Sequence, residues 1–198
     1  MSKPRFFRKK IFFVLLLGVI TSVAYFPTNH FRFFDLVEVP ILSWDHKIPY
    51  IPWMMIVYLS FFLKLALVIL WTDHPEQMYR AFYGYCLIIF VSFFIYLFWP
   101  TKFYWDHSHC HDFFTQYLYL PMKKLDSPQN ACPSSHVSLS FAGAFIFLFM
   151  GCWKKGMVFF LWASLIAIST VAVKQHCVMD VVFGFFLSFT CCFFVFIS

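Results

Sequence analysis

The sequence predicts an all-α, polytopic membrane protein built as a bundle of six transmembrane helices. Of the 198 residues, 62% are hydrophobic and only 12% are charged, whereas soluble domains carry roughly 25% charged residues. The 31 phenylalanines would give a soluble fold more apolar surface than one core of this size could bury. Lipid is an acceptable neighbour for that surface. The length predicts a single domain covering residues 1–198.

Six apolar runs are long enough to be read as membrane helices, because a hydrocarbon core about 30 Å thick needs roughly 20 apolar residues in a helix. They cover residues 11–26, 52–71, 81–99, 134–152, 157–173 and 179–197. The connecting segments 27–51 and 100–133 are long. Long ordered loops on a helical scaffold often carry function, so we expect functional residues near the end of the bundle that these segments cover.

Basic residues predict the orientation. Five of the fifteen lysines and arginines lie within the first ten positions, directly before the first apolar run. Such a cluster favours a cytoplasmic N-terminus, so six spans place both termini in the cytoplasm. The net charge of +6 therefore belongs to a membrane flank. We expect no nucleic-acid partner, because no basic stripe with interleaved exposed aromatics recurs downstream.

The first chemical motif is Cys132-Pro133-Ser134-Ser135-His136, at the outer end of the fourth predicted span. Proline followed by serine is a good helix opening, and the first amides of a helix lack intrahelical partners. Free amides and the positive end of the helix dipole favour phosphate binding. We therefore expect the amides of Ser134 and Ser135 to bind phosphate, with His136 within one turn of the anion.

The second motif opens the last predicted span and contains Lys174, His176 and Asp180. The histidine and the aspartate are four residues apart, so they would share one helix face. The carboxylate could then orient the imidazole as a nucleophile or base, although an acid in a first turn could instead only cap the helix. Lys174 adds a cation for a phosphate oxygen. Ionisable residues at membrane depth are costly and usually mark function.

These motifs resemble the type 2 phosphatidic acid phosphatase superfamily, whose members have a six-helix membrane core. The residues that carry the resemblance are Pro133-Ser134-Ser135-His136 and His176-x-x-x-Asp180-Val181-x-x-Gly184. The family's own motifs read Pro-Ser-Gly-His and Ser-Arg-x-x-x-x-x-His-x-x-x-Asp. The resemblance implies that His176 attacks phosphorus and forms a phosphohistidine, that His136 protonates the leaving oxygen, and that Asp180 orients the nucleophile. It implies no metal and no cofactor.

The chain departs from the family pattern at several positions. Ser135 replaces the glycine, and Ser169-Thr170 stands where the family has Ser-Arg. Lys174 is the candidate replacement for the missing arginine. The upstream Lys/Arg motif is absent, and Lys102 is the candidate cation at that place. A Lys-Gln-His run before the aspartate resembles the inositol phosphorylceramide and sphingomyelin synthase branch, which transfers a phospho-headgroup to a lipid alcohol.

The expected function is a membrane lipid-phosphate phosphatase acting at the extracytoplasmic face through a phosphohistidine. The expected partners are a lipid phosphate and the surrounding membrane lipids, and the compact chain is typical of a bacterial inner membrane. A lipid phosphotransferase is the first alternative. A transporter or non-catalytic membrane subunit is the second, although we find no inverted repeat to support transport. Neither the substrate lipid nor the oligomeric state follows from the sequence.

Two further groups of residues leave alternatives open. His107, His109 and His111 would share one face of an extended segment and could ligate zinc or copper. A solvated polar loop beside the active-site mouth is the preferred interpretation. The cysteines on the outer side are Cys110, Cys132 and Cys177. In an oxidising compartment, two of them could form a disulfide.

Overall fold

The computed structural model describes residues 3–105 and 110–197, which form eight α-helices. These are α1 Lys3–His30, α2 Ser43–Lys47, α3 Met55–Leu70, α4 Pro75–Phe98, α5 Leu120–Leu125, α6 Ser135–Phe149, α7 Trp153–Ala172 and α8 Val178–Ile197. A 3₁₀ turn (η1, Pro52–Met54) precedes α3, and a π-helical turn (η2, Thr115–Tyr119) precedes α5. The strands β1 (Val37–Glu38) and β2 (Thr101–Lys102) form one short parallel pair. The all-α prediction is confirmed apart from this pair.

Five helices are long and apolar enough to cross a membrane: α1, α3 with its preceding turn, α4, α7 and α8. Large apolar side chains are exposed along them, including Phe12, Phe62, Phe90, Leu161 and Phe194. Water would not favour such a surface, but lipid would. The five helices therefore indicate an integral membrane protein.

The sixth predicted span is shorter than expected. Residues 134–152 form α6, which has only 15 residues and is about 22 Å long at 1.5 Å per residue. Ser134 caps its start, and Gly151, with a φ of 73°, turns the chain after its end. By length α6 falls short of a full span, so five spans are found where six were predicted. α1 is longer than the predicted run 11–26, because its polar flanks are also helical.

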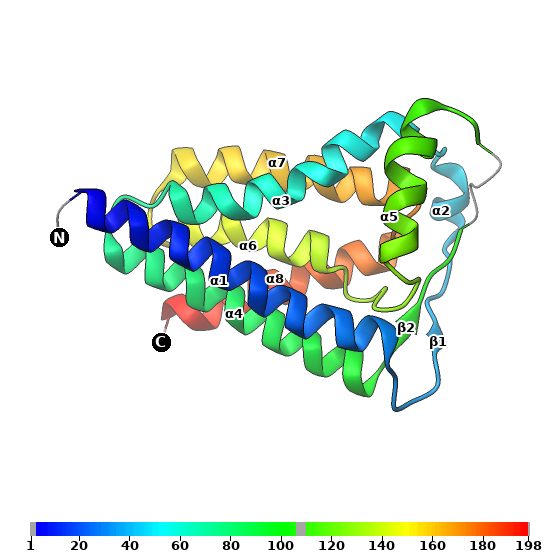
Figure 1. The fold of residues 1–198 in the computed structure, drawn as a ribbon, viewed down its shortest axis with the longest axis horizontal. Coiled ribbons are helices and arrows are strands. Elements are labelled where there is room, and N and C mark those ends of the chain that lie inside the picture. Colours follow the sequence, from blue (N-terminus) through cyan, green and yellow to red (C-terminus); the bar gives the residue numbers. More distant parts are fainter. Residues whose placement is uncertain (1–2, 106–109, 198) are drawn as a thin grey trace.

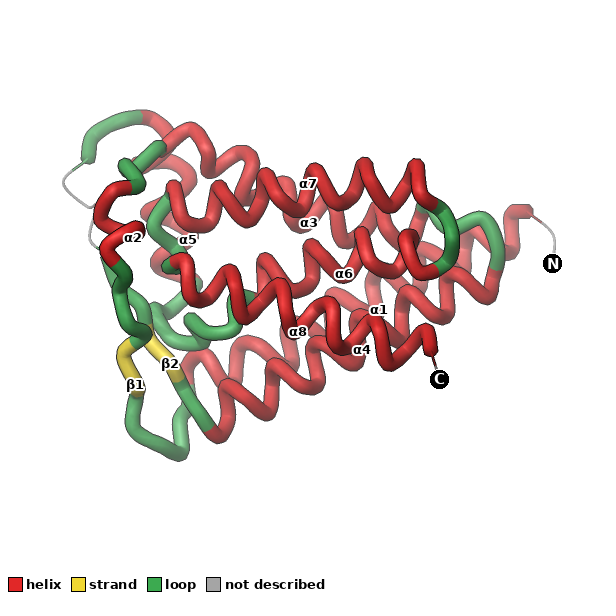
Figure 2. Tube along the Cα trace, turned by 180° about the vertical axis from the view of Figure 1, so that it is seen from behind, coloured by secondary structure: helices red, strands yellow, loops and turns green. Residues whose placement is uncertain are grey.

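α6 is the central helix of the bundle. It packs against α3, α4, α7 and α8, and Figures 1 and 2 show it enclosed between α3 and α7 on one side and α1 and α4 on the other. Eleven of its 15 residues are buried. A helix that is apolar all round is stable only when neighbours cover it. The first residues of α6 are therefore held by the surrounding helices.

The two long connecting segments cover one end of the bundle. α5 lies across this end, and α2 and the β1–β2 pair lie beside it (Figure 1). The start of α6 and the start of α8 face the same end, whereas the start of α1 and the end of α8 lie at the opposite one (Figures 1 and 2). The topology thus brings both sequence motifs under the cover formed by α5 and α2.

Candidate active site

The start of α6 is tied to the start of α8 by a backbone hydrogen bond. The amide of Ser134 donates to the carbonyl oxygen of Asp180 over 3.1 Å, and the hydroxyl of Ser134 accepts from the amide of Val137 over 3.4 Å. The Ser134 amide, which we expected to bind phosphate, is thus already bonded within the protein. Ser135 is the first residue of the helix, where amides have no intrahelical acceptor, so its amide is the better placed of the two.

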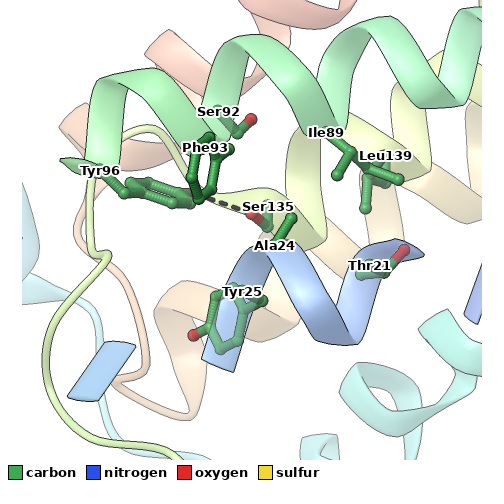
Figure 3. A pocket seen from close by; sticks show the side chains of 9 residues that line it. All are labelled: Thr21, Ala24, Tyr25, Ile89, Ser92, Phe93, Tyr96, Ser135 and Leu139. Atoms are coloured by element: carbon green, nitrogen blue, oxygen red, sulfur yellow. Dashed lines mark hydrogen bonds between the residues drawn. The ribbon is translucent and has the colours of Figure 1, made fainter. Parts of the chain in front are cut away.

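The Ser135 side chain is held by α4. Its hydroxyl lies 2.7 Å from the hydroxyl of Tyr96, which also donates to the carbonyl of Pro133. Figure 3 shows this contact where α1, α4 and α6 meet around a small pocket. The serine that replaces the family's glycine therefore has a partner for its hydroxyl. Tyr96 was not among the predicted site residues, because nothing in its sequence context distinguishes it from other aromatics of α4.

Asp180 holds His176 and caps α8 at the same time. Its Oδ2 lies 3.2 Å from Nδ1 of His176 and accepts from the amide of Cys177 over 3.0 Å. Cys177 directly precedes the helix and Asp180 is its third residue, so the carboxylate forms half of a capping box. The carboxylate thus contacts the imidazole of His176 and caps the helix at the same time, so its geometry fits both interpretations of Asp180. His176 itself lies in the turn before α8 rather than on its face.

The two motif histidines face each other. The ring centroids of His136 and His176 are 5.8 Å apart. His136 packs against the rings of Tyr58 and Phe61, at centroid distances of 4.5 and 4.7 Å. Its Nδ1 lies 3.4 Å from the Tyr58 hydroxyl. Because a carboxylate oxygen accepts hydrogen bonds, the contact of Nδ1 with Asp180 favours the tautomer that leaves the lone pair on Nε2.

The sequence model of the PAP2 superfamily matches residues 81–198, a stretch that starts in α4 and includes both motifs. The chain belongs to the PAP2 superfamily. Membership implies a phosphatase-like function on phosphomonoesters. Comparisons with curated proteins and with solved structures gave no match.

In this PAP2 protein, the side chain of Lys174 contacts other parts of the chain and does not point into the pocket beside His176. Its side chain is 3% exposed, its Nζ donates to the backbone carbonyl of Asp45 over 2.6 Å, and it lies over the ring of Trp105 at 4.4 Å. Burial lowers the pKa of Lys174, and the charge of Asp45 opposes this shift. Asp45 Oδ1 also accepts from the amide of Val178 over 2.8 Å. Lys174 and Asp45 together fasten the turn that carries His176 to α2.

Lys102 also has a partner of its own. It lies on β2 and forms an ion pair with Glu38 of β1 at 2.9 Å. The pocket in front of His176 is lined instead by Lys123 and Asp126, at the end of α5, and by Gln175. The sequence analysis did not select these residues, although the adjacent Lys123 and Lys124 in the long outer segment were a signal of local positive charge.

A larger cavity, of about 420 Å³, adjoins His136. It lies between α1, α3, α5 and α6, and most of its lining is apolar. Among the lining residues, Phe26, Phe62 and Leu125 are exposed on the outer surface of the bundle. The lining of the cavity therefore includes both exposed apolar side chains and the polar groups of His136 and Asp126.

The outer cysteines are free thiols. Cys132 and Cys177 are buried, and burial, followed by the charge of Asp180, raises the pKa of each thiol to about 12. Neither thiol is therefore ionised at neutral pH, which makes them poor nucleophiles. His107 and His109 lie outside the described residues, so the zinc or copper alternative for the histidine run stays a prediction.

Proposed function

We propose that this PAP2 protein removes the phosphate of a lipid phosphate through a phosphohistidine on His176. The observation that carries the proposal is the His176–Asp180 pair facing His136 across 5.8 Å. A nucleophile oriented by a carboxylate, opposite a second proton-transfer group, is the arrangement that covalent phosphoryl transfer needs. Metal and cofactor have no role in the proposal.

The reaction has two balanced steps. Nε2 of His176 attacks phosphorus and forms an N–P bond while the P–O bond to the lipid alcohol breaks, and His136 gives a proton to the departing oxygen. Water then attacks the phosphohistidine and gives its proton to His136. The N–P bond breaks, and inorganic phosphate leaves. Asp180 stabilises the positive charge on His176 in both steps.

Negative charge on the phosphoryl group needs stabilisation as the bonds change. The amide of Ser135 and the N-terminal end of the α6 dipole supply part of it. Lys123 lines the pocket beside His176 and supplies a full positive charge. Lys174 and Lys102 would act at longer range, because their amines contact Asp45 and Glu38.

The cavity that adjoins His136 supports a lipid as the class of substrate. An apolar space of about 420 Å³ is of the size that small-molecule sites have, and a water-soluble phosphate ester would leave its apolar lining unused. An acyl or alkyl chain lying between α1 and α3 would place its phosphorylated end at the histidines. This arrangement supports a lipid phosphate as substrate.

For the membrane, we propose that α6 completes a six-helix core in one domain covering residues 1–198. The basic cluster at the start of α1 supports a cytoplasmic N-terminus, and with it an active site on the extracytoplasmic face of what we propose is a bacterial inner membrane. The shortness of α6 fits a site that lies at the edge of the hydrocarbon core. Accessibility of cysteines placed in the α4–α5 segment to an impermeant reagent tests this orientation.

Transfer to a lipid alcohol instead of water is the second candidate function. It is favoured by Gln175, which lines the pocket with His176 and could bind an acceptor hydroxyl. The experiment uses purified protein in detergent with a panel of lipid phosphates and a chelator, and it measures free phosphate and lipid products together. His176→Ala should lose turnover, whereas His74→Ala, on an exposed histidine at the far end of the bundle, should keep it.

The outcomes separate the candidates. Phosphate release that is lost in His176→Ala supports the phosphatase, and an acid-labile phosphoenzyme should form in the native protein only. A new phospholipid without free phosphate would favour the transferase. Turnover equal in the native protein and His176→Ala would contradict both. A transporter or non-catalytic subunit would show no turnover in either protein.

A further inference from the structure

Asp126 lies between the two cavities that meet at the histidines. It follows the last residue of α5 and lines both the apolar cavity that contains His136 and the pocket that contains His176. A lipid whose chain fills the first cavity and whose phosphate reaches the second must therefore pass this carboxyl group. The mechanism proposed above gives it no role.

The carboxyl group is held in place from one side. The hydroxyl of Tyr25, on α1, donates to Oδ1 of Asp126 over 2.8 Å. In the part of the chain that the structure describes, Oδ2 has no such donor. One oxygen is thus fixed by the scaffold, and the other is available to a ligand in the adjoining cavities.

A carboxylate beside a phosphate site carries an electrostatic cost, because like charges repel in a partly buried pocket. Burial raises the pKa of Asp126, and the hydrogen bond from Tyr25 and the charge of His176 oppose that shift. A group that donates a hydrogen bond to Oδ2 would offset the cost, whereas a second anion would increase it. The chemistry of the position therefore favours a hydrogen-bond donor over a second anion.

We propose that Asp126 binds a hydroxyl group of the substrate next to the phosphorylated carbon, and so selects lipid phosphates that carry a free hydroxyl there. The inference rests on the proposed lipid-phosphatase function and names its substrate class. With the chain between α1 and α3 and the phosphate between the histidines, this hydroxyl lies at the junction of the two cavities.

The test compares two substrates of equal chain length, a monoacylglycerol phosphate, which has the hydroxyl, and an alkyl phosphate, which lacks it. Hydrogen bonds to charged groups predict a preference of about tenfold to a hundredfold in kcat/KM for the hydroxylated substrate in the native protein. Asp126→Asn should reduce this preference at least about fivefold, chiefly through KM. Tyr25→Phe should reduce it less, and Asp35→Asn, on an exposed carboxylate, should leave it unchanged.

Two results would overturn the inference: no preference in the native protein, or the native preference kept in Asp126→Asn. If Asp126→Asn does not fold, Tyr25→Phe decides, because it frees Oδ1 and keeps the carboxylate. An unchanged preference in Tyr25→Phe would then count against the inference. Failure of the proposed function is seen separately, as phosphate release from both substrates that persists in His176→Ala.

Discussion

Replacing Gly184 with alanine tests whether the close approach of α8 to the start of α6 sets the position of the two histidines. A Cβ on Gly184 would lie 2.8 Å from the backbone oxygen of Ser134 and 3.1 Å from Cβ of Val137. Ordinary contacts of this kind begin at 3.4 Å, so the first distance is too short by about 0.6 Å (3.4 − 2.8). The oxygen belongs to the backbone and cannot turn away. We therefore expect α8 to move away from α6.

The Gly184→Ala substitution has two opposing effects on the free energy of unfolding. Overpacking costs roughly 1–3 kcal/mol, against a gain of about 1 kcal/mol for alanine over glycine in a helix. A shift of about 1 Å in reacting groups can cost about a hundredfold in rate, so a shift of 0.6 Å predicts a loss of about tenfold in kcat. Gly18→Ala is the control, because a Cβ there meets nothing within 4 Å. Gly18→Ala should show only the gain in stability from the higher helix propensity of alanine.

The assay is kcat for phosphate release together with the thermal midpoint, for both variants in the same detergent. Gly184→Ala should lose rate and gain no stability, whereas Gly18→Ala should keep its rate and melt at a slightly higher temperature. Native kcat in Gly184→Ala, at a lowered midpoint, would refute the claim that this contact positions the histidines. Equal increases in midpoint for the two variants would refute the steric argument itself.

Three further predictions follow from the site. Asp180→Asn should lower kcat by roughly three orders of magnitude with little change in KM, because an amide does not hold the same imidazole tautomer; steady-state kinetics measure this. Lys123→Ala should raise KM about tenfold by removing a phosphate-directed charge, and an unchanged KM, or an equal rise in the exposed neighbour Lys124→Ala, would argue against that role. Asp126→Asn should raise the thermal midpoint at neutral pH. Because burial raises the pKa of Asp126 in the folded state, the native protein loses stability as pH rises through that pKa; the advantage of the variant should therefore shrink as the pH is lowered, and an advantage that grows on acidification would contradict the sign.

Local sequence patterns predicted the contacts that form within one segment of the chain. The pairing of His176 with Asp180 followed from their spacing, although the turn before α8 brings them together rather than a shared helix face. The helix start after Pro133 was also predicted from the sequence, because proline and serine favour a helix start. We predicted that the Ser134 amide binds phosphate. In the structure this amide donates instead to the carbonyl oxygen of Asp180, a contact that the local sequence does not indicate.

The sequence did not predict the positions of residues that contact distant parts of the chain. Lys174 is next to His176 in the sequence, yet its amine points to α2, because the carbonyl of Asp45 and the ring of Trp105 lie there. Lys123 and Asp126 are far from His176 in the sequence and line its pocket, because α5 lies across the end of the bundle. Proximity along the chain was a poor guide to which cation faces the site.

The sequence by itself determined that this chain is a helical membrane protein of the PAP2 superfamily, since composition, apolar runs and two short motifs are properties of local segments. The tertiary structure decided that α6 is a short buried helix, that His136 meets His176, and that Asp126 stands between their cavities. These features arise from contacts between helices, and the close approach of Gly184 on α8 to the start of α6 is one of them. Such contacts depend on which side chains meet in space, and local patterns along the sequence do not show that.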